Sequence, residues 1–349
     1  MILVQFGDLH LDMPYENLSA AAARYRREAD RKLLCAVCEL AKRENADAIV
    51  CTGDLFDSPR PYLDSCLCAA KVFSQIDIPV FLAPGNHDPF SPSSPYEAVD
   101  WPKNVRIFSS AAPISFTFPN FRITGWANTE HRSYLRPLEN FRAEKISGKP
   151  EILVFHGEIG SDSPYFSADS AQIAASGADY LALGHIHAHF QKRIGSCLAV
   201  MNGGVQACRR GETGEKGAIV ANITSEGSSA KLVSLGGCRA FDIELEDRGE
   251  EELSAMLSRL ITAPKENAMV TLTLSGEPLT DSTWLKAFSK GFLSFKTEDR
   301  RKKKTATRSG KSLSALFARA AINSGLSELA TEFGLCALEN REQPSKKDF

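Results

Sequence analysis

Five short segments of the chain contain residue types that bind metal ions in proteins. They are Gly-Asp-Leu-His at 7–10, Gly-Asp at 53–54, Gly-Asn-His-Asp at 85–88, His-Gly at 156–157 and Gly-His-Ile-His at 184–187. Their carboxylate, amide and imidazole groups suit Mn²⁺, Fe²⁺ or Zn²⁺, and none of them contains a thiolate. A carboxylate can bridge two ions, and two ions about 3.5–4 Å apart can hold a phosphodiester and activate a water molecule. The pattern therefore predicts a two-metal centre for phosphoester chemistry.

The histidines of the chain are concentrated in these segments. Five of the seven histidines lie in them, and only His131 and His189 lie outside. A lone histidine after a strand is more often an ordinary core or surface residue. Five histidines placed in this order are not expected by chance, so we interpret them as one functional group.

Each segment follows an apolar stretch that is typical of a strand. These expected strands lie at 2–6, 48–52, 78–83, 152–155 and 179–183. Helical patterns at 19–45 and 62–75 separate the first three strands, which predicts βαβ units and a largely parallel sheet. Sites in open α/β sheets form at the carboxyl ends of strands, so the five segments can converge on one point.

The region after residue 100 is richer in strands than in helices. Further expected strands lie at 105–108, 114–118, 121–126, 190–194, 198–201, 217–223 and 230–235. They predict a second sheet with more antiparallel character than the first. Two packed sheets with helices outside them form a four-layer αββα sandwich, which is the predicted α/β fold class.

Four regions are expected along the 349 residues. The sandwich spans 1–237, and a small α+β cap domain with a strand–helix–strand pattern spans 238–295. A basic linker follows at 296–311, with eight Lys or Arg against two acidic residues. Residues 312–349 are predicted to form C-terminal helices with a break near Gly325.

Composition sets further limits on the class of protein. The net charge of −2 argues against a chain coated with positive charge, although a local basic face can still bind phosphates. The chain shows no signal-peptide pattern and no apolar run of the roughly 18 residues that a membrane helix needs. The nine cysteines include no two Cys-x-x-Cys pairs at zinc-site spacing, which favours buried thiols in a reducing compartment. We therefore expect a cytoplasmic protein without membrane association.

The order of the five segments resembles that of the calcineurin-like metallophosphoesterase superfamily, D-x-H, G-D, G-N-H-D/E, H and G-H-x-H, over residues 1 to about 237. The resemblance implies a set of ligands for each ion: Asp8, His10, Asp54 and His187 for the first, and Asn86, His156 and His185 for the second. Asp54 would bridge the two ions. His87 would be the acid near the leaving group, with Asp88 orienting its imidazole, since a histidine can donate a proton near neutral pH.

Residues 6–14, 52–57 and 211–217 are similar to segments of the SbcD-like DNA repair exonucleases, and so is the layout of domains. The resemblance implies that the cap domain shapes a DNA-binding cleft. It also implies that the C-terminal helices dock on the coiled coil of an SMC-like ATPase and that the nuclease forms a homodimer. We therefore expect a Mn²⁺-dependent DNA exonuclease or endonuclease with two divalent ions, for which Fe or Zn is the alternative to Mn.

Several residues outside the five segments are candidates for contact with DNA. They are Arg209, Arg210, Arg301, Lys302 and Lys303. Lysine and arginine can bind phosphates and release counterions, but plain surface charge and a solvated linker are the alternative interpretations. The apolar helical stripe at 313–333 has two interpretations as well, because it either docks a partner or packs on its own chain.

Three other residues lie close to the segments in sequence. Asp12 and Asp57 either orient ligands or serve in turns and caps, and His131 either lines the cleft or has a structural role. Two competing functions also stay open. One is a small-molecule phosphodiesterase acting on cyclic or dinucleotides, and the other is a non-catalytic subunit that binds DNA or protein.

Overall fold

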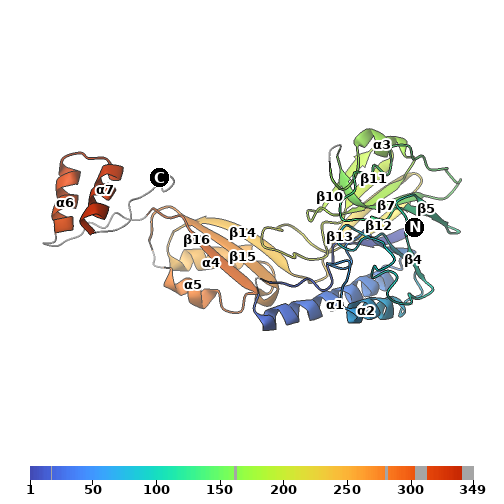
Figure 1. Cartoon of the computed structure of the whole chain (residues 1–349), viewed down its shortest axis with the longest axis horizontal. Coiled ribbons are helices and arrows are strands. Elements are labelled where there is room, and N and C mark those ends of the chain that lie inside the picture. Colours follow the sequence, from blue (N-terminus) through green and yellow to red (C-terminus); the bar gives the residue numbers. More distant parts are fainter. Residues whose placement is uncertain (17, 161–162, 280–281, 303–312, 340–349) are drawn as a thin grey trace.

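The computed structural model describes residues 1–16, 18–160, 163–279, 282–302 and 313–339. Its helices are α1 Ala20–Arg43, α2 Leu63–Phe73, α3 Ser170–Ala175, α4 Glu250–Leu260, α5 Thr283–Phe288, α6 Leu313–Asn323 and α7 Glu328–Glu339, with one 3₁₀ turn at Lys265–Asn267. Figure 1 shows the sandwich with both sheets at one end of the molecule and the last two helices at the other.

The first sheet has six strands in the order β13-β12-β1-β2-β3-β4. Their bounds are β1 Ile2–Phe6, β2 Ala48–Cys51, β3 Val80–Leu82, β4 Val105–Ile107, β12 Ala218–Thr224 and β13 Gly227–Val233. Strands β1 to β4 are parallel, and α1 and α2 connect the first three of them as the sequence predicts, whereas β12 and β13 add antiparallel pairings beyond β1. The sequence order had suggested the second sheet for β4 as well as for β12 and β13, and that prediction is wrong for all three strands.

The second sheet has its main strands in the order β10-β11-β9-β7-β6-β5, with β8 paired to β7. Their bounds are β5 Ile114–Thr117, β6 Arg122–Gly125, β7 Glu151–Ile159, β8 Phe166–Ala168, β9 Tyr180–Gly184, β10 Phe190–Ile194 and β11 Cys197–Met201. The four central strands are parallel, and among the described strands of this sheet antiparallel pairs occur only at β5–β6 and β10–β11. The expected antiparallel character is therefore wrong, because the crossover between β6 and β7 runs through a segment without helical periodicity.

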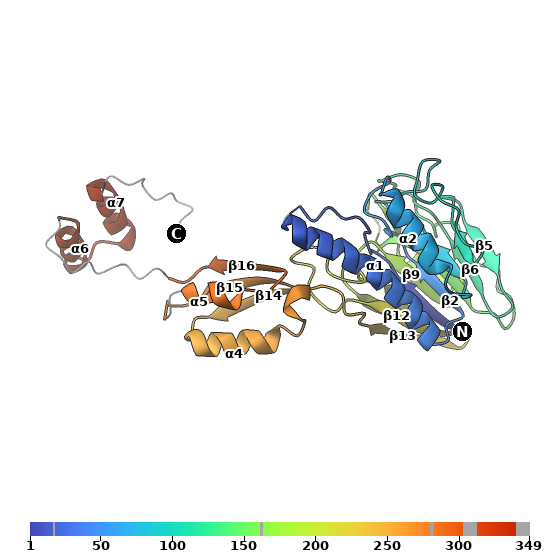
Figure 2. The ribbon, with the colours of Figure 1, turned by 90° about the horizontal axis from the view of Figure 1, so that it is seen from below.

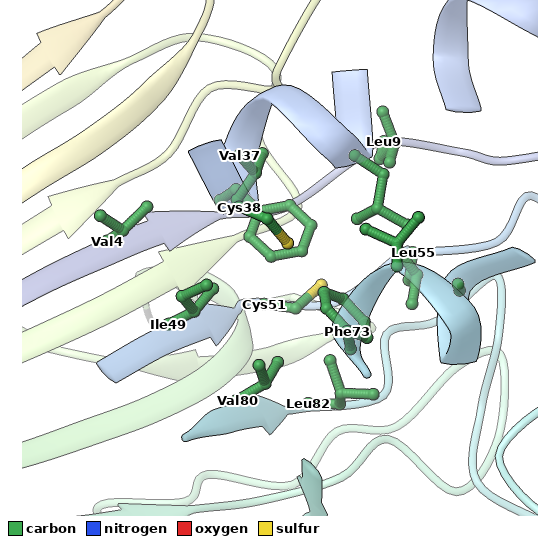
Figure 3. Packing of buried hydrophobic residues seen from close by; sticks show 14 of the residues in the cluster. Val4, Leu9, Val37, Cys38, Ile49, Cys51, Leu55, Phe73, Val80 and Leu82 are labelled. Carbon is green, nitrogen blue, oxygen red and sulfur yellow. The ribbon is translucent and has the colours of Figure 1, made fainter. Parts of the chain in front are cut away.

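The two sheets and their covering helices form the predicted four-layer sandwich. Alternate residues of β1 point to opposite faces, so Leu3 packs in the cluster between the sheets and Val4 packs in the cluster under α1 and α2. Figure 3 shows this second cluster, with Val37 of α1 and Phe73 of α2 against the strands. The outer layer over the second sheet contains the short helix α3 and long loops. Burial on both faces of each sheet holds the strand ends in fixed positions.

Helix α1 begins and ends where its sequence predicts. The Ser19 hydroxyl accepts a hydrogen bond from the amide of Ala22, and Lys42 and Arg43 lie in the last turn, where positive charge favours the helix dipole. Leu33, Leu34 and Val37 bury the apolar face against the first sheet. Helix α1 is therefore held against the first sheet by its N-terminal cap, its basic last turn and its buried apolar face.

A smaller sheet follows the sandwich and forms, with its helices, what is called here the small domain. Its parallel strands are β14 Arg239–Glu246, β15 Ala268–Ser275 and β16 Ser294–Asp299, in the order β14-β15-β16. The predicted strand–helix–strand pattern is present, and α5 and β16 add a second crossover that was not predicted from the sequence. Leucines of α4, α5 and β15 share one apolar cluster, so both helices cover the same face.

The predicted start of the basic linker at residue 296 is wrong, because residues 296–299 belong to strand β16. Residues 296–299 pair with β15 as part of β16, because their alternation of Lys, Thr, Glu and Asp continues the edge of the small sheet. Lys302 is the last described residue before the gap at 303–312. Lys303 therefore lies outside the described residues.

The two C-terminal helices predicted on either side of Gly325 are confirmed as α6 and α7. They pack against each other, and Figures 1 and 2 both show them beyond the small domain and apart from the sandwich. Among the described residues, no helix combines the length and apolar character required to cross a membrane.

Candidate metal centre

The seven predicted ligands come together at the carboxyl ends of four strands and in the second half of a fifth. Asp8 and His10 follow β1, Asp54 follows β2 and Asn86 follows β3, while the remaining ligands come from the second sheet. His156 lies within β7, and His185 and His187 follow β9. Because β1, β2 and β3 are adjacent and parallel, as are β7 and β9, their ends meet across the sandwich.

Two glycines allow the segments to approach this closely. A Cβ at Gly53 would overlap the ring of His156, and a Cβ at Gly85 would overlap the carboxylate of Asp54. Gly53 also has a φ of +109°, which L-residues rarely adopt. The glycines beside the ligands are therefore required by packing at the centre as well as by the turn.

One group of side chains gathers around Asp8. The Nε2 atoms of His10 and His187 lie 3.3 Å apart, and Nε2 of His187 lies 3.6 Å from Oδ1 of Asp8. Ligand atoms of these three residues all lie within 4.8 Å of one another. This spacing is compatible with binding to one ion.

A second group gathers around Asn86. Its Oδ1 lies 2.9 Å from Nε2 of His156 and 3.1 Å from Nδ1 of His185. The Oδ2 atom of Asp54 lies 3.3 Å from Nε2 of His156 and 3.7 Å from Nε2 of His10. Asp54 thus faces both groups, which is the position that a bridging carboxylate needs.

An unpaired buried oxygen, as well as the types of the clustered residues, fits a pair of divalent ions. Oδ2 of Asp8 is buried and has no hydrogen-bond partner among the described residues, which is costly unless a cation is bound there. The donor atoms are carboxylate, amide and imidazole groups, with no cysteine among the clustered residues. Such a set accepts Mn²⁺, Fe²⁺ or Zn²⁺.

The carboxylates give the centre a strongly negative potential. Burial would lower the pKa of His10, but the hydrogen bond to Asp57 and the charges of Asp54 and Asp8 raise it to about 9. Burial likewise opposes the rise in the pKa of His156, which Asp54 raises to about 9. The pKa of Asp54 is lowered well below its usual range, because contacts with His156 and His10 outweigh the effect of burial. The same potential favours bound divalent cations.

Several ligands are oriented by a second contact. Nδ1 of His10 lies 2.9 Å from Oδ1 of Asp57, and Nδ1 of His156 lies 2.9 Å from the carbonyl oxygen of Thr52. Such contacts fix the ring and its tautomer. Asp57 therefore has the orienting role that the sequence had left open. Asp12 has the structural one, since its carboxylate accepts from the amide of Tyr62 at the start of α2.

His87 lies beside the two groups of ligands and is partly exposed. Its backbone amide donates to Oδ1 of Asp54 at 2.9 Å, and its ring Nδ1 lies 3.2 Å from the carbonyl oxygen of Asp57 and 3.6 Å from Oδ1 of Asp57. Its ring also meets the ring of His10 edge-on, with centroids 4.8 Å apart. This position suits a group that exchanges a proton with a molecule at the centre.

The predicted contact between Asp88 and the imidazole of His87 is wrong. The Asp88 carboxylate points away from the ring and accepts hydrogen bonds from Gly85 N at 2.7 Å, Phe56 N at 3.0 Å and Tyr96 Oη at 2.7 Å. Burial and the charge of Asp54 raise the pKa of Asp88 to about 7. Asp88 therefore braces the loop that carries Asn86, and Asp57 is the carboxylate nearest to His87.

The structure adds Tyr165 and Glu212 as neighbours that residue spacing did not reveal, and it gives a contact for His131, whose role the sequence had left open. The ring of Tyr165 lies against His185 with centroids 4.3 Å apart, and Nδ1 of His131 lies 2.9 Å from the carbonyl oxygen of Asn86. Oε1 of Glu212 lies 3.0 Å from Nδ1 of His187. Tyr165 and Glu212 had no signal of their own in the sequence, although Glu212 lies in segment 211–217, which resembles the SbcD-like nucleases.

A cavity of about 540 Å³ opens beside the metal centre, between the sandwich and the small domain. Its walls include Asp57, Arg209 and Arg210 from the sandwich and Met269 and Ser294 from the small domain. Nη1 of Arg210 donates to Oγ of Ser294 at 2.7 Å, which joins the two sides. Asp57 connects this cavity to the candidate ligands, because its Oδ1 lies 2.9 Å from Nδ1 of His10.

The basic residues of the small domain are placed differently. The side chain of Arg301 is only 6% exposed, and its guanidinium donates to Asp247 and Asp299 at 2.6 Å. Its predicted contact with DNA is wrong, because the charge is buried in ion pairs with the strand ends. Lys302 is exposed, so its predicted DNA contact stays a prediction.

Comparison with known proteins places this centre in a family context. The family model described as calcineurin-like phosphoesterase matches residues 1–189. The uncharacterized metallophosphoesterase YhaO of Bacillus subtilis (strain 168) is 28% identical over 314 residues, covering 84% of this chain and 75% of that protein.

The DNA double-strand break repair protein Mre11 of Aeropyrum pernix is 28% identical over 174 residues, covering 44% of this chain and 42% of that protein. The protein of the same name from Sulfurisphaera tokodaii is 24% identical over 245 residues, covering 67% of this chain and 60% of that protein. The chain thus spans less than two thirds of these two relatives. Among solved structures, a dimetal phosphatase from Danio rerio is 13% identical, with a TM-score of 0.43, covering 67% of this chain and 99% of that one.

Proposed function

The chain belongs to the calcineurin-like phosphoesterase family, and we propose that it is a Mn²⁺-dependent DNA nuclease that cleaves phosphodiester bonds at a two-metal centre. The observation that carries this proposal is a cavity whose walls include Arg209, Arg210 and Asp57, the last of which contacts the candidate ligand His10. The similarity to proteins named for DNA double-strand break repair supports DNA as the substrate.

The proposed reaction assigns a separate task to each group of side chains. Two divalent ions, when bound by the seven ligands, would hold the phosphodiester and supply an activated water. His87 donates a proton to the departing sugar oxygen, and the carbonyl and carboxylate of Asp57 keep its ring turned toward the centre. Arg209 and Arg210 bind the phosphates that flank the cleaved bond.

Incubating the chain with Mn²⁺ and linear DNA, either double-stranded or single-stranded, tests the proposal directly. Degradation of either form is expected, together with cleavage of the small diester bis(p-nitrophenyl) phosphate. If DNA stayed intact while a cyclic dinucleotide or the small diester was cleaved, the nuclease proposal would fail. The second candidate, a small-molecule phosphodiesterase, would then replace it, and the cavity volume of about 540 Å³ is compatible with such a ligand.

The two arginines allow a sharper test of DNA binding. Replacing both Arg209 and Arg210 with alanine should weaken DNA binding and make its salt dependence shallower. The slope of the logarithm of the binding constant against the logarithm of the salt concentration should fall in magnitude by about 0.7–0.9 per lost phosphate contact. Hydrolysis of bis(p-nitrophenyl) phosphate should change little. Arg259→Ala is the matched control, because Arg259 is exposed in the last turn of α4 and does not line the cavity. Unchanged DNA affinity in the double variant would contradict this part of the proposal.

The proposal extends to a protein partner and a second copy of the chain. Leu316, Ile322 and Leu326 are 49–61% exposed on and beside α6, which supports docking of a coiled coil from an SMC-like ATPase. Co-purification with that coiled coil is expected for the full chain and not for residues 1–302.

Tyr62 and Leu63 are 71% and 56% exposed at the start of α2, which supports a homodimer. Sedimentation of the Leu63→Glu variant would test it, because a charge in that interface should favour the monomer. A cytoplasmic location, suited to free thiols, belongs to the same proposal.

A further inference from the structure

A short segment after β11 holds the ligand His187 at two points. The carboxylate of Glu212 lies 3.0 Å from the ring Nδ1 of His187. The ammonium group of Lys216 donates to the carbonyl oxygen of His187 and, at 2.9 Å, to that of Gly203. Lys216 is only 2% exposed, although lysine is seldom buried without a specific partner. One end of the segment therefore contacts the ring of His187 and the other contacts its backbone.

The Glu212 carboxylate is itself fixed by a second hydrogen bond. Its Oε2 accepts from the amide of Cys208 at 2.8 Å, while Oε1 faces His187. Both oxygens are thus occupied, and the side chain is only 16% exposed. A carboxylate held in this way can accept from only one orientation of the histidine ring.

The opposite nitrogen of the ring faces the metal centre. Nε2 of His187 lies 3.6 Å from Oδ1 of Asp8 and 3.3 Å from Nε2 of His10. In a neutral imidazole one nitrogen carries the proton and the other offers its lone pair. A proton kept on Nδ1 by Glu212 leaves the lone pair on Nε2, where the other ligands converge.

We propose that Glu212 is a positioning residue for the metal ligand His187, which fixes the ring orientation and the Nδ1–H tautomer, while Lys216 fixes the backbone of the same residue. The proposal rests on the two-metal centre of the proposed function and does not depend on DNA as the substrate. The same hydrogen bond to Cys208 also anchors the turn that carries Arg209 and Arg210 into the cavity.

Mn²⁺ titration of the full chain by calorimetry tests the proposal without any substrate. The wild-type chain is expected to bind two ions, and Glu212→Ala should bind one of them about 10–100-fold more weakly. Glu212→Gln should show an intermediate loss, because its amide keeps one acceptor oxygen where the carboxylate uses two. Glu215→Ala is the matched control, since Glu215 lies in the same segment and pairs with Arg239 at the surface. Its affinities should equal those of the wild type.

The tautomer supplies a readout that a purely structural role would leave unchanged. In ¹⁵N NMR spectra of the metal-free chain, His187 should be in the Nδ1–H form in the wild type and in Glu215→Ala, and should shift toward the Nε2–H form in Glu212→Ala. Thermal melting of each variant reports on folding, and Glu212→Gln replaces Glu212→Ala if the latter does not fold. Wild-type affinity for both ions and an unchanged tautomer in the Glu212 variants would overturn the proposal. A wild-type chain that bound fewer than two ions would contradict the metal centre as well.

Discussion

Four of the seven candidate ligands have a backbone conformation that L-residues rarely adopt. The φ angles are +52° for Asp8, +51° for His10, +49° for Asp54 and +103° for His185. Each such residue costs on the order of 1–3 kcal/mol unless its surroundings hold it in place. The hydrogen bonds from the amides of His185 and His87 to Asp8 and Asp54 are part of that support. The centre therefore concentrates strain and negative charge at one place, and bound cations would offset the charge.

Removal of metal ions should lower the stability of the whole sandwich. An ion present at about 100 times its dissociation constant stabilises a folded chain by about 2.7 kcal/mol. For a domain of this size, each kcal/mol shifts the melting temperature by roughly 2–4 °C. Adding a chelator to the Mn²⁺-loaded chain should therefore lower the melting temperature by several degrees, as calorimetry would measure. In Asp54→Asn, which loses the bridging carboxylate, the chelator should lower the melting temperature little or not at all.

His87 and Asp88 should behave differently although they are neighbours in sequence. His87→Ala should retain both ions and lose roughly 10²–10⁴-fold in kcat for diester hydrolysis, because it removes the proton donor. Asp88→Asn should destabilise the chain by about 1–3 kcal/mol, because amide hydrogens would then face buried N–H groups. Metal analysis and denaturant unfolding separate the two effects. Loss of ions in His87→Ala would show that His87 is a ligand instead.

At the scale of elements, a buried polar network joins α1 to the loop that follows β1. Oδ2 of Asp30 accepts from the hydroxyl of Tyr15 at 2.9 Å, and Oδ1 of Asp30 accepts from Nε2 of Gln206 at 2.6 Å. Arg26 donates to the Tyr15 hydroxyl and to the carbonyl oxygen of Ala207. The network places α1 against both segments that lead into the cavity, so its stability affects their geometry.

The network gives a pH dependence of known sign. Burial raises the pKa of Asp30 to about 6, whereas the unfolded carboxyl has its ordinary lower value. Between about pH 4 and pH 6 the folded chain keeps a proton that the unfolded chain has lost, so this residue reduces the free energy of unfolding as pH rises. Asp30→Asn removes that contribution. Its stability relative to the wild type should therefore improve by roughly 1–3 kcal/mol between pH 4 and pH 7. If the difference in the free energy of unfolding between Asp30→Asn and the wild type were the same at pH 4 and pH 7, the buried position of the carboxyl would be contradicted.

The small domain should depend on Arg301 for stability. Replacing Arg301 with methionine removes its ion pair with the buried carboxylate of Asp247, and breaking a buried pair typically costs about 3–5 kcal/mol. Denaturant unfolding should detect this loss, while Lys302→Ala, a change at the exposed neighbour, should have almost no effect. Normal stability with weakened DNA binding in Arg301→Met would restore the interpretation as a DNA contact.

Elements with strong periodicity could be predicted from the sequence, and weakly patterned ones could not. Strand β1 and helix α1 have unbroken apolar patterns, so their bounds agree with the prediction to within a few residues. Strand β16 alternates polar residues at a sheet edge and looks like a charged linker. The parallel pairing of β6 with β7 depends on a long loop whose path no local pattern records.

At the scale of the whole molecule, the gathering of the candidate ligands could be predicted because all of them except His156 follow a strand, but their supporting contacts could not. Asp57 and Glu212 reach His10 and His187 across distances in sequence that no motif fixes. The cavity likewise depends on how the small domain lies beside the sandwich, with Met269 and Ser294 facing Arg210. Residue spacing therefore predicts the reaction class better than the substrate.

The electron paramagnetic resonance spectrum of the chain loaded with Mn²⁺ tests the central claim most directly. The position of Asp54 between the two ligand groups predicts two ions per chain, joined by its carboxylate and close enough for their spins to couple. The expected result is the spectrum of a spin-coupled pair at a stoichiometry of two. The six-line spectrum of an isolated ion, at one Mn²⁺ per chain, would contradict a two-metal centre.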